Sequence, residues 1–312
     1  MSFYLVTGGG GFIGSNIVEE LIKRGEKVRV LDNFSTGKRD NLLPFQDQVE
    51  LVEGDIRSYH IVRAAVEGVD FILHQAALPS VPRSINDPLT TNEVNVVGTL
   101  NILNAAKDVG VKRIVYASSS SIYGDLETMP KTEDMLPKPL SPYAVSKLAG
   151  EKYCQVFTKL YGLETVALRY FNVFGPRQDP ASQYSAVIPK FIKMLQQGKS
   201  PTVFGDGEQS RDFTFVQNVV HANMLACGEG LESLSGEVFN IAFGKRITIN
   251  ALVEKINAIL GTHVDPVYAE PRSGDVKHSL ANIGKARQFL GYEPEIDFEE
   301  GLRRTIAFMK DE

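Results

Sequence analysis

The chain has 312 residues, of which 43% are hydrophobic and 23% charged, and this balance excludes a disordered chain or a coiled coil. The formal net charge of -5 and the lack of a compact basic block argue against a nucleic-acid partner. Apolar runs end well short of the roughly 18 residues that a membrane-spanning helix needs, and no basic leader precedes the first apolar run. We therefore expect a cytoplasmic protein without a membrane partner.

Cysteine and histidine give no sign of a metal site. Cys154 and Cys227 are far apart, and the five histidines are scattered outside any ligand spacing. We expect neither a disulfide framework nor a bound metal.

Short apolar runs alternate with helix-period runs from the first residues to about residue 170. This alternation is typical of β/α units, whose crossover helices place the strands in a parallel sheet buried on both faces. The expected strands are 3–7, 27–31, 48–53, 71–75, 113–118 and 165–170, and the expected helices are 13–24, 61–66, 94–108 and 143–160.

After Asn172 the pattern changes to pieces punctuated by glycine and proline, which predict a smaller second domain. Helices are expected there at 186–197, 249–260 and 301–309. Residues 213–243 contain a further helix and strand, so we expect them to return to the first domain, 1–171. Residues 172–212 and 244–312 then form the second domain, with a cleft between the two.

A glycine-rich turn separates the first strand from the first helix. The segment TGGGGFIG spaces Gly8, Gly11 and Gly14 as GxxGxxG, close to the common dinucleotide fingerprint GxGxxG. Glycines let the backbone approach a pyrophosphate, and the N–H groups that open the helix favour its negative charge. The turn predicts a dinucleotide site.

An acidic residue indicates which dinucleotide binds. Asp32 ends the second expected strand, where a carboxylate accepts hydrogen bonds from the adenosine ribose and repels a 2'-phosphate. Lys38 and Arg39 follow closely and could tolerate that phosphate, but the acid at the strand end favours NAD over NADP.

Tyr143 and Lys147 in SPYAVSK lie one helical turn apart and share a face. Ser141 is a candidate N-cap, with Pro142 at the first helical position. An ammonium group near a phenol favours the phenolate, so Tyr143 is a candidate general base. Four serines, 118–121, end the strand 113–118 at the sheet edge where ligands gather, and some of them are expected only to cap that strand.

These motifs together resemble the extended short-chain dehydrogenase/reductase family, and within it the NAD-dependent nucleotide-sugar epimerases of the UDP-galactose 4-epimerase type. The resemblance covers essentially the whole chain. It rests on TGGGGFIG, LDNFSTGKRDN, GDI, HQAA, SSSSIYG, YAVSK, RYFNVFGPRQ and PRSGD, which occur in the family's order. It implies an α/β fold, a doubly wound parallel Rossmann sheet with a smaller α/β substrate domain, and a homodimer formed through the helices 94–108 and 143–160.

The resemblance also implies roles for individual residues. The cofactor-binding residues would be Gly8, Gly11, Phe12, Ile13, Gly14, Asp32, Asn33, Ser35, Thr36, Gly37, Asp55, Ile56, Ala76, Ala77, Asn95, Tyr143 and Lys147. Tyr143 would be the base, Lys147 its electrostatic partner, and Ser119 the hydroxyl that bonds the reacting sugar oxygen. The substrate-binding residues would be Ser119, Ser120, Tyr143, Asn172, Arg211, Arg272, Asp275 and Ser279.

The serine segment discriminates among the reactions of this family. The related 4,6-dehydratases carry Asp and Glu where Ser120 and Ser121 stand, and the UDP-glucuronate decarboxylases carry Glu at the second position. The resemblance therefore implies reversible oxidation at C4, that is, C4 epimerisation of a UDP-hexose through a 4-keto sugar. The loop LPSVPRSINDP resembles that of epimerases acting on N-acetylated UDP-hexosamines, and Ser279 stands where some family members carry a bulky aromatic side chain. The resemblance therefore implies UDP-GlcNAc/UDP-GalNAc, with UDP-Glc/UDP-Gal as a further or alternative pair.

Other readings remain open at this point. UDP-glucuronate 4-epimerases carry similar serine segments, and a dehydratase, decarboxylase or net reductase would share the fold. A dinucleotide sensor without chemistry is disfavoured because Tyr143 and Lys147 are both present. The chain departs from the family at Gln217–Asn218, where an Asp usually precedes two valines, and at Pro79.

Overall fold

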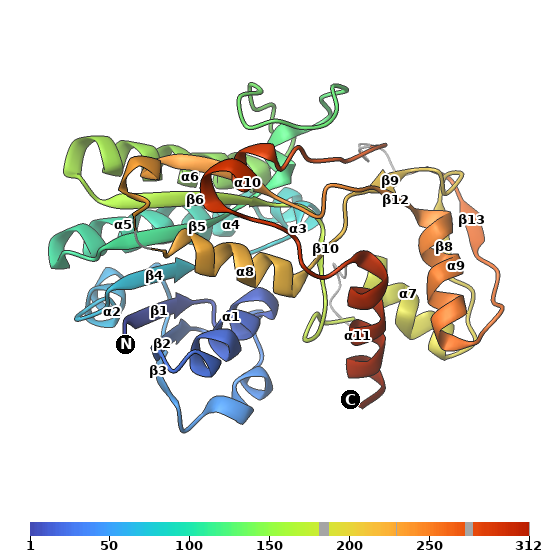
Figure 1. The fold of residues 1–312 in the computed structure, drawn as a ribbon, viewed down its shortest axis with the longest axis horizontal. Helices are drawn as coiled ribbons and strands as arrows, with labels where there is room; N and C mark the ends of the chain where they lie inside the picture. The colour runs from blue at the N-terminus through green and yellow to red at the C-terminus, as the bar shows by residue number, and fades with distance from the viewer. Residues whose placement is uncertain (181–186, 229, 272–276, 312) are drawn as a thin grey trace.

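Seven short segments pair in parallel to form one sheet in the computed structural model, which describes residues 1–180, 187–228, 230–271 and 277–311 (Figure 1). In spatial order the strands are β11 (Glu237–Ile241), β6 (Glu164–Tyr170), β5 (Arg113–Ser119), β4 (Phe71–His74), β1 (Phe3–Thr7), β2 (Lys27–Asp32) and β3 (Val49–Glu53). The predicted parallel Rossmann sheet is confirmed.

Helices cover both faces of this sheet. The helices α1 (Phe12–Lys23), α8 (Val216–Ala226) and α10 (Gly284–Leu290) pack on one face. The helices α2 (Tyr59–Ala65), α5 (Gly98–Val109) and α6 (Pro142–Tyr161) pack on the other. Because each face is buried, the strands from β4 to β6 carry almost continuous apolar runs.

The helix α6 begins as the sequence predicts. Ser141 Oγ accepts a hydrogen bond from the Ala144 N–H at 3.2 Å, and Pro142 opens the helix. Gly162, at φ 72°, ends it in the left-handed conformation. Both ends of α6 are therefore fixed by local sequence.

The expected helix 94–108 differs from the observed one. A π-helical turn, Glu93–Val97, joins α4 (Pro88–Asn92) to α5, and a further short helix, α3 (Val81–Asn86), precedes them. The side chain of Asn95 in this turn is buried and binds the loop before α3 through two hydrogen bonds. Its Oδ1 accepts from Leu78 N–H at 2.7 Å, and its Nδ2 donates to Leu78 O at 3.2 Å. Wider turns of this kind are frequent at functional sites.

A second core lies beside the carboxyl ends of the large sheet. It contains the helices α7 (Val187–Gln196), α9 (Ile249–Leu260) and α11 (Phe298–Asp311), packed around buried aromatic side chains such as Phe174 and Phe215 (Figure 1). Its short strands are β7 (Val173–Phe174), β8 (Thr202–Phe204), β9 (Ser210–Arg211), β10 (Thr214–Phe215), β12 (Ile247–Thr248) and β13 (Val267–Ala269). Single-turn helices lie at Arg39–Asn41, Leu43–Phe45, Ser120–Tyr123 and Glu232–Leu234.

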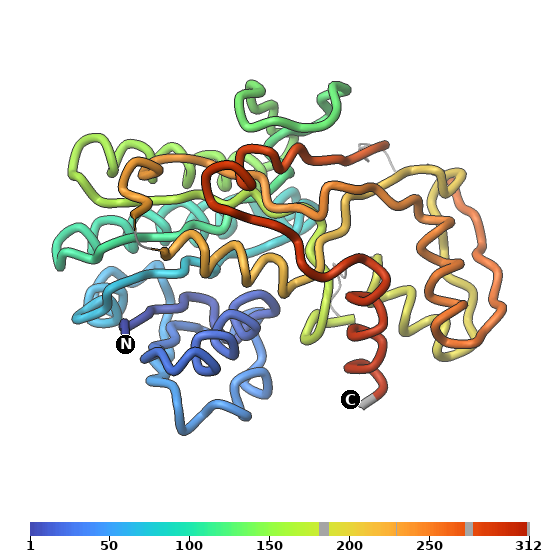
Figure 2. Tube along the Cα trace, in the orientation of Figure 1, coloured from blue at the N-terminus to red at the C-terminus, as the bar shows by residue number. Residues whose placement is uncertain are grey.

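The chain passes repeatedly between the two cores, as the trace in Figure 2 shows. After α7 and β8 it returns through α8, which packs on α1, and β11, which pairs with β6. It leaves again for α9 and comes back through α10, which packs on β11 and α8, before ending in α11. None of the described helices is long and apolar enough to cross a membrane.

Candidate active site

The glycine turn after β1 has no room for side chains. A Cβ on Gly8, whose φ is 70°, would lie 2.7 Å from Ala76 N, and one on Gly14 would lie 2.1 Å from Gly8 O. The helix α1 starts directly after Gly11 without a side-chain cap, so its first N–H groups remain available for an anion. This turn fits the pyrophosphate of a dinucleotide.

Asp32 holds the glycine turn from the end of β2. Its two carboxylate oxygens accept hydrogen bonds from Gly10 N–H at 2.8 Å and Phe34 N–H at 2.7 Å. Burial raises the pKa of Asp32, and these backbone hydrogen bonds work in the opposite direction.

The two cations that could have bound a 2'-phosphate are engaged elsewhere. Lys38 forms an ion pair with Asp179 at 3.3 Å, and Arg39 forms one with Glu53 at 2.5 Å. Together with the carboxylate of Asp32, this arrangement favours NAD over NADP.

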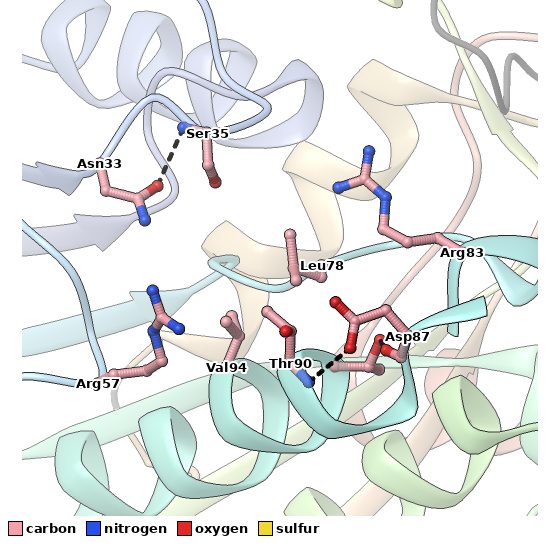
Figure 3. A pocket seen from close by; sticks show the side chains of 9 residues that line it. Asn33, Ser35, Arg57, Leu78, Arg83, Asp87, Thr90 and Val94 are labelled. Atoms are coloured by element: carbon pink, nitrogen blue, oxygen red, sulfur yellow. Dashed lines mark hydrogen bonds between the residues drawn. The ribbon is translucent and has the colours of Figure 1, made fainter. Parts of the chain in front are cut away.

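A cavity of about 360 Å³ opens between the loop after β2 and the helices α3 and α4 (Figure 3). Two predicted cofactor residues, Asn33 and Ser35, line it. The loop 78–88, which the sequence indicates as a substrate-specificity segment, contributes Leu78, Arg83 and Asp87. The remaining lining residues, Arg57, Thr90, Thr91 and Val94, were not predicted. Most of them come from the irregular segment before α5, whose folding no spacing pattern indicates.

Asp55, a predicted adenine contact, lies beside this cavity. Arg57 donates to both of its oxygens, at 3.0 and 2.8 Å, and Asn33 Nδ2 donates to Oδ2 at 2.9 Å. The Arg57 hydrogen bonds lower the pKa of Asp55 to about 2. Asp55 therefore stays ionised and keeps the neighbouring side chains in place.

A chain of buried hydrogen bonds supports the predicted nicotinamide side. Ala76 N–H donates to Thr7 Oγ1 at 3.2 Å, and Thr7 Oγ1 lies 2.7 Å from His74 Nδ1. His74 Nε2 lies 3.0 Å from Thr99 Oγ1, which donates to Asn95 O at 2.6 Å. Because Thr99 donates its only hydroxyl proton to Asn95 O, it accepts a hydrogen bond from His74 Nε2, and Thr7 donates to His74 Nδ1. The imidazole therefore carries its proton on Nε2.

Tyr143, Lys147 and Ser119 meet where α6 crosses the end of β5. A hydrogen bond from Ser119 reaches the Tyr143 hydroxyl, and Lys147 Nζ donates to Ala117 O at 2.8 Å and lies 6.0 Å from the centre of the Tyr143 ring. Burial raises the pKa of Tyr143, and the Ser119 hydrogen bond lowers it. Burial lowers the pKa of Lys147 to about 8, so the ammonium form still predominates at pH 7 and the neutral amine is also accessible near this pH.

The four serines divide between chemistry and support. Ser118 is buried and donates to Glu151, away from the cleft. Ser119 Oγ accepts from Ser121 N–H at 3.2 Å and Ser121 Oγ at 2.9 Å, which leaves its own proton free to donate to Tyr143. Ser120 is partly exposed at the same turn.

The predicted substrate residues beyond β6 gather around Asp212. Asn172 Nδ2 donates to Asp212 O at 3.1 Å, and Ser279 N–H donates to Ser210 O at 3.0 Å, next to Arg211. Asn172 lies two residues beyond Tyr170, which is the register partner of Ser119. Asn172 thus lies close to the Ser119 end of the sheet, and Arg211 and Ser279 lie on the segments next to Asp212. Arg272 and Asp275 lie outside the described residues.

Sequence reasoning did not identify Asp212 itself. Its carboxylate is fully buried and accepts from the N–H groups of Phe243, Gly244 and Ala281. These donors belong to two crossings between the cores, so Asp212 fastens both crossings beside Arg211. Burial raises its pKa to about 7.

The unusual Asn218 has a structural role far from this site. Its Nδ2 donates to Ile296 O at 2.7 Å, and its Oδ1 accepts from Glu295 and Ile296 N–H, both at 3.0 Å. An amide satisfies all three contacts, which explains why Asp is dispensable here. No structural consequence of Pro79 is evident.

Residues 4–242 match the family described as NAD dependent epimerase/dehydratase family. A UDP-N-acetylglucosamine 4-epimerase from Methanobrevibacter ruminantium M1, solved with UDP-N-acetylmuramic acid, is 42% identical, with a TM-score of 0.94 over 99% of this chain and 98% of that one.

Two further solved structures are similar over nearly their whole length. The UDP-glucose 4-epimerase of Thermotoga maritima, solved with UDP-glucose, is 37% identical with a TM-score of 0.94, covering 99% of both chains. A UDP-glucuronic acid 4-epimerase variant from Bacillus cereus, solved with NAD and a fluorinated UDP-glucuronic acid, is 31% identical with a TM-score of 0.92, also covering 99% of both chains.

Proposed function

Because the chain belongs to the NAD-dependent epimerase/dehydratase family, we propose that it interconverts C4 epimers of a UDP-hexose through a 4-keto sugar. The observation that carries this proposal is the meeting of Tyr143, Ser119 and Lys147 at the same edge of the sheet as the glycine turn. Most of the described residues implied to bind NAD lie along that turn, the end of β2 and the loop after β4.

The side chains supply proton chemistry at the C4 hydroxyl. Ser119 donates a hydrogen bond to the C4 oxygen of the sugar, and Tyr143, as the base, accepts the proton of the C4 hydroxyl. The Lys147 ammonium favours the phenolate form of Tyr143 and so offsets the effect of burial on its pKa. NAD bound along the turn supplies the redox chemistry at C4.

The same residues explain why the 4-keto sugar goes no further. Ser120 and Ser121 carry hydroxyls where the related dehydratases and decarboxylases carry acids. No carboxylate at these positions can remove or add a proton at another sugar carbon. When C4 is reduced again, from either face of the sugar, Tyr143 returns the proton to the C4 oxygen and the cycle is complete.

The preferred substrate in this proposal is the UDP-GlcNAc/UDP-GalNAc pair, with UDP-Glc/UDP-Gal also accepted. Asn172, Arg211 and Ser279 would hold the UDP-sugar, with Arg272 and Asp275 as further proposed contacts. Ser279 is small and partly buried beside β9, which leaves room for an N-acetyl group. The similar M. ruminantium enzyme, solved with an N-acetylated UDP-sugar, supports this choice.

We also propose that two copies pair through α5 and α6. Val156, Leu160 and Tyr161 on α6 are 45%, 66% and 53% exposed, an apolar strip that a second copy would cover. The molecular mass in solution tests this arrangement.

The first test incubates the purified protein separately with UDP-GlcNAc, UDP-Glc and UDP-glucuronate, without added reductant, and resolves the products by NMR. We expect a C4 epimer at equilibrium, formed fastest from UDP-GlcNAc. Tyr143→Phe should lower the rate at least about a hundredfold, since it removes the base. Tyr161→Phe, the same change at the exposed end of α6, should keep the rate.

Each other result has a definite meaning. A released 4-keto sugar or carbon dioxide would replace the epimerase with a dehydratase or decarboxylase. Conversion of UDP-glucuronate alone would move the substrate to the glucuronate class that the B. cereus structure represents. No conversion of any of the three sugars would refute the proposal.

A further inference from the structure

A buried ion pair lies next to Lys147, one helical turn further along the face of α6 that carries Tyr143 and Lys147. Glu151, one turn beyond Lys147, is 1% exposed, and Arg169 on β6 is 3% exposed. Arg169 Nε and Nη2 donate to the two carboxylate oxygens of Glu151, each at 2.9 Å. The pairing is bidentate, the strongest geometry for these two groups.

This pair completes a regular attachment of α6 to β5. Three side chains of α6 at four-residue spacing, Tyr143, Lys147 and Glu151, contact three consecutive residues of β5. Tyr143 bonds Ser119, Lys147 Nζ donates to Ala117 O, and Glu151 Oε1 accepts from Ser118 Oγ at 2.5 Å. A slip or rotation of the helix would break all three contacts together.

Stability alone does not account for two buried charges at this place. Desolvation of a carboxylate and a guanidinium largely cancels their attraction, and apolar side chains of similar size would often hold the fold as well. Arg169 Nη1 also donates to Tyr123 OH at 2.7 Å, and Tyr123 OH donates to Asn240 Oδ1 at 2.7 Å. The pair therefore links α6, β5 and β6 to the turn after the serines and to β11.

The pairing also decides which charge acts on Tyr143. Glu151 is neutralised by Arg169, so it leaves the ammonium of Lys147 uncompensated one helical turn away. The titratable groups that face Lys147 are His74, Tyr116 and Tyr143, and those that face the pair are Tyr116, Tyr123, Glu133 and Cys154.

We propose that Glu151 and Arg169 are positioning residues for the reaction. Their ion pair holds Tyr143 and Lys147 in register with residues 117–119 and prevents the Glu151 charge from neutralising Lys147. This inference rests on the proposed function, in which Tyr143 is the base.

Glu151→Gln tests the proposal because it leaves the Arg169 guanidinium charged and unpaired. We expect kcat to fall about a hundredfold through misplacement of Tyr143, with little change in KM. The extra positive charge should also lower the midpoint of the acidic limb of kcat by about one pH unit. Glu151→Gln/Arg169→Gln removes both charges, so the midpoint should return to the wild-type value while kcat stays low.

The ion pair of Arg113 on β5 with Glu164 on β6 offers a control that shares strand β6 with the tested pair. Arg113 Nε and Nη2 donate to Glu164 Oε2 at 2.9 and 2.6 Å, where β5 and β6 begin. These residues lie about 17 Å along β5 from Ser118. Glu164→Gln should cost stability while keeping kcat and the pH midpoint.

A second readout does not depend on the sugar. The ultraviolet absorbance of tyrosinate, measured against the same protein carrying Tyr143→Phe, reports the ionisation of Tyr143 itself. We expect its midpoint to fall in Glu151→Gln and to recover in the double variant. If wild-type protein converts no UDP-sugar but this midpoint shifts, the proposed function fails and the positioning role stands.

The opposite outcomes overturn the inference. Wild-type kcat and an unshifted midpoint in a folded Glu151→Gln protein would show that the pair is only structural. If that single variant does not fold, the double variant decides, and wild-type kcat in the double variant would refute the positioning role.

Discussion

His74 stays uncharged in the folded protein although it lies beside the lysine of the site. Burial, together with a smaller effect of the Lys147 charge, lowers its pKa from 6.5 to about 3. A second positive charge here would break the hydrogen bond that His74 accepts from Thr7. The neutral imidazole thus links Thr7 to Thr99 by hydrogen bonds, and these two threonines in turn bind the backbone of Ala76 and Asn95 at the proposed nicotinamide side.

This neutrality predicts a loss of stability in acid. Between pH 6.5 and 3 the unfolded chain binds a proton that the folded protein excludes, so the free energy of unfolding falls as the pH drops through this window. The loss at pH 5.5 relative to pH 8 is about 1.4 kcal/mol from this residue. Urea unfolding of His74→Asn at both pH values should show a pH dependence smaller by that amount.

Comparison of variants isolates this effect from others. Asp212, whose pKa burial raises to about 7, has the opposite sign: it favours the folded state in acid and loses that contribution as the pH rises toward 7. It is present in every variant and cancels. As a control, His60→Asn changes an exposed histidine of α2 and should keep the wild-type pH dependence of the free energy of unfolding. A wild-type pH dependence in His74→Asn would show that His74 does not cause the loss of stability in acid.

At the scale of elements, the contact of α6 with β5 depends on one missing side chain. A Cβ on Gly150 would lie 2.2 Å from the Tyr116 hydroxyl, which itself donates to Lys147 O at 3.4 Å. Helix and strand can approach this closely only because Gly150 has no side chain. The distance between α6 and β5 in turn places Tyr143 and Lys147.

Gly150→Ala should therefore move the helix and weaken catalysis. We expect a loss of about 1–3 kcal/mol in the free energy of unfolding, from overpacking, and at least about a tenfold lower kcat. Denaturant unfolding and steady-state kinetics measure the two. Lys152→Ala, on the exposed side of the same helix, is the control. A variant that loses stability but keeps full kcat would show that this spacing does not matter for the chemistry.

Elements with a regular period were predictable from sequence, and those held by single side chains were not. Apolar runs, with Ser141 as N-cap and Pro142 at the first helical position, predicted α6 and its neighbouring strands. The π-helical turn and the helices α3 and α4 depend on Asn95 binding Leu78, a contact that no periodicity indicates. Most of the unforeseen cavity residues come from this segment.

The same contrast applies to the site. Glycine spacing and the Tyr143–Lys147 interval are local patterns, and the structure places both at the carboxyl ends of the strands. Asp212 and Arg169 act on residues far away in the sequence, and their partners are known only once the chain is folded. Glu151 could have been noticed, because it continues the four-residue spacing of Tyr143 and Lys147.

At the scale of the whole molecule, one loop of the second core reaches across to the cofactor-binding side of the first. Arg177 Nη2 donates to Asn16 Oδ1 at 2.9 Å and forms an ion pair with Glu19 at 2.5 Å, both on α1. Asp179 in the same loop pairs with Lys38. The helix that opens at the glycine turn is thereby fastened to the second core.

We predict that this fastening slows the release of NAD. Arg177→Met removes the ion pair between loop and helix, and NAD should leave about tenfold faster, measured as bound NAD during dialysis. Lys23→Met removes a different partner of Glu19, one within α1 itself, and should keep the wild-type release rate. Equal release from both variants would show that the loop does not control retention.

The place of β11 in the chain has a consequence for synthesis on the ribosome. This strand covers the edge of β6, yet the whole of α7, β8 and α8 is made between the two. At about 5–20 residues per second, the nascent sheet keeps an open, apolar edge for several seconds. Unpaired edges of this kind bind other chains, so rapid production exposes the protein to aggregation before the last strand of the large sheet exists.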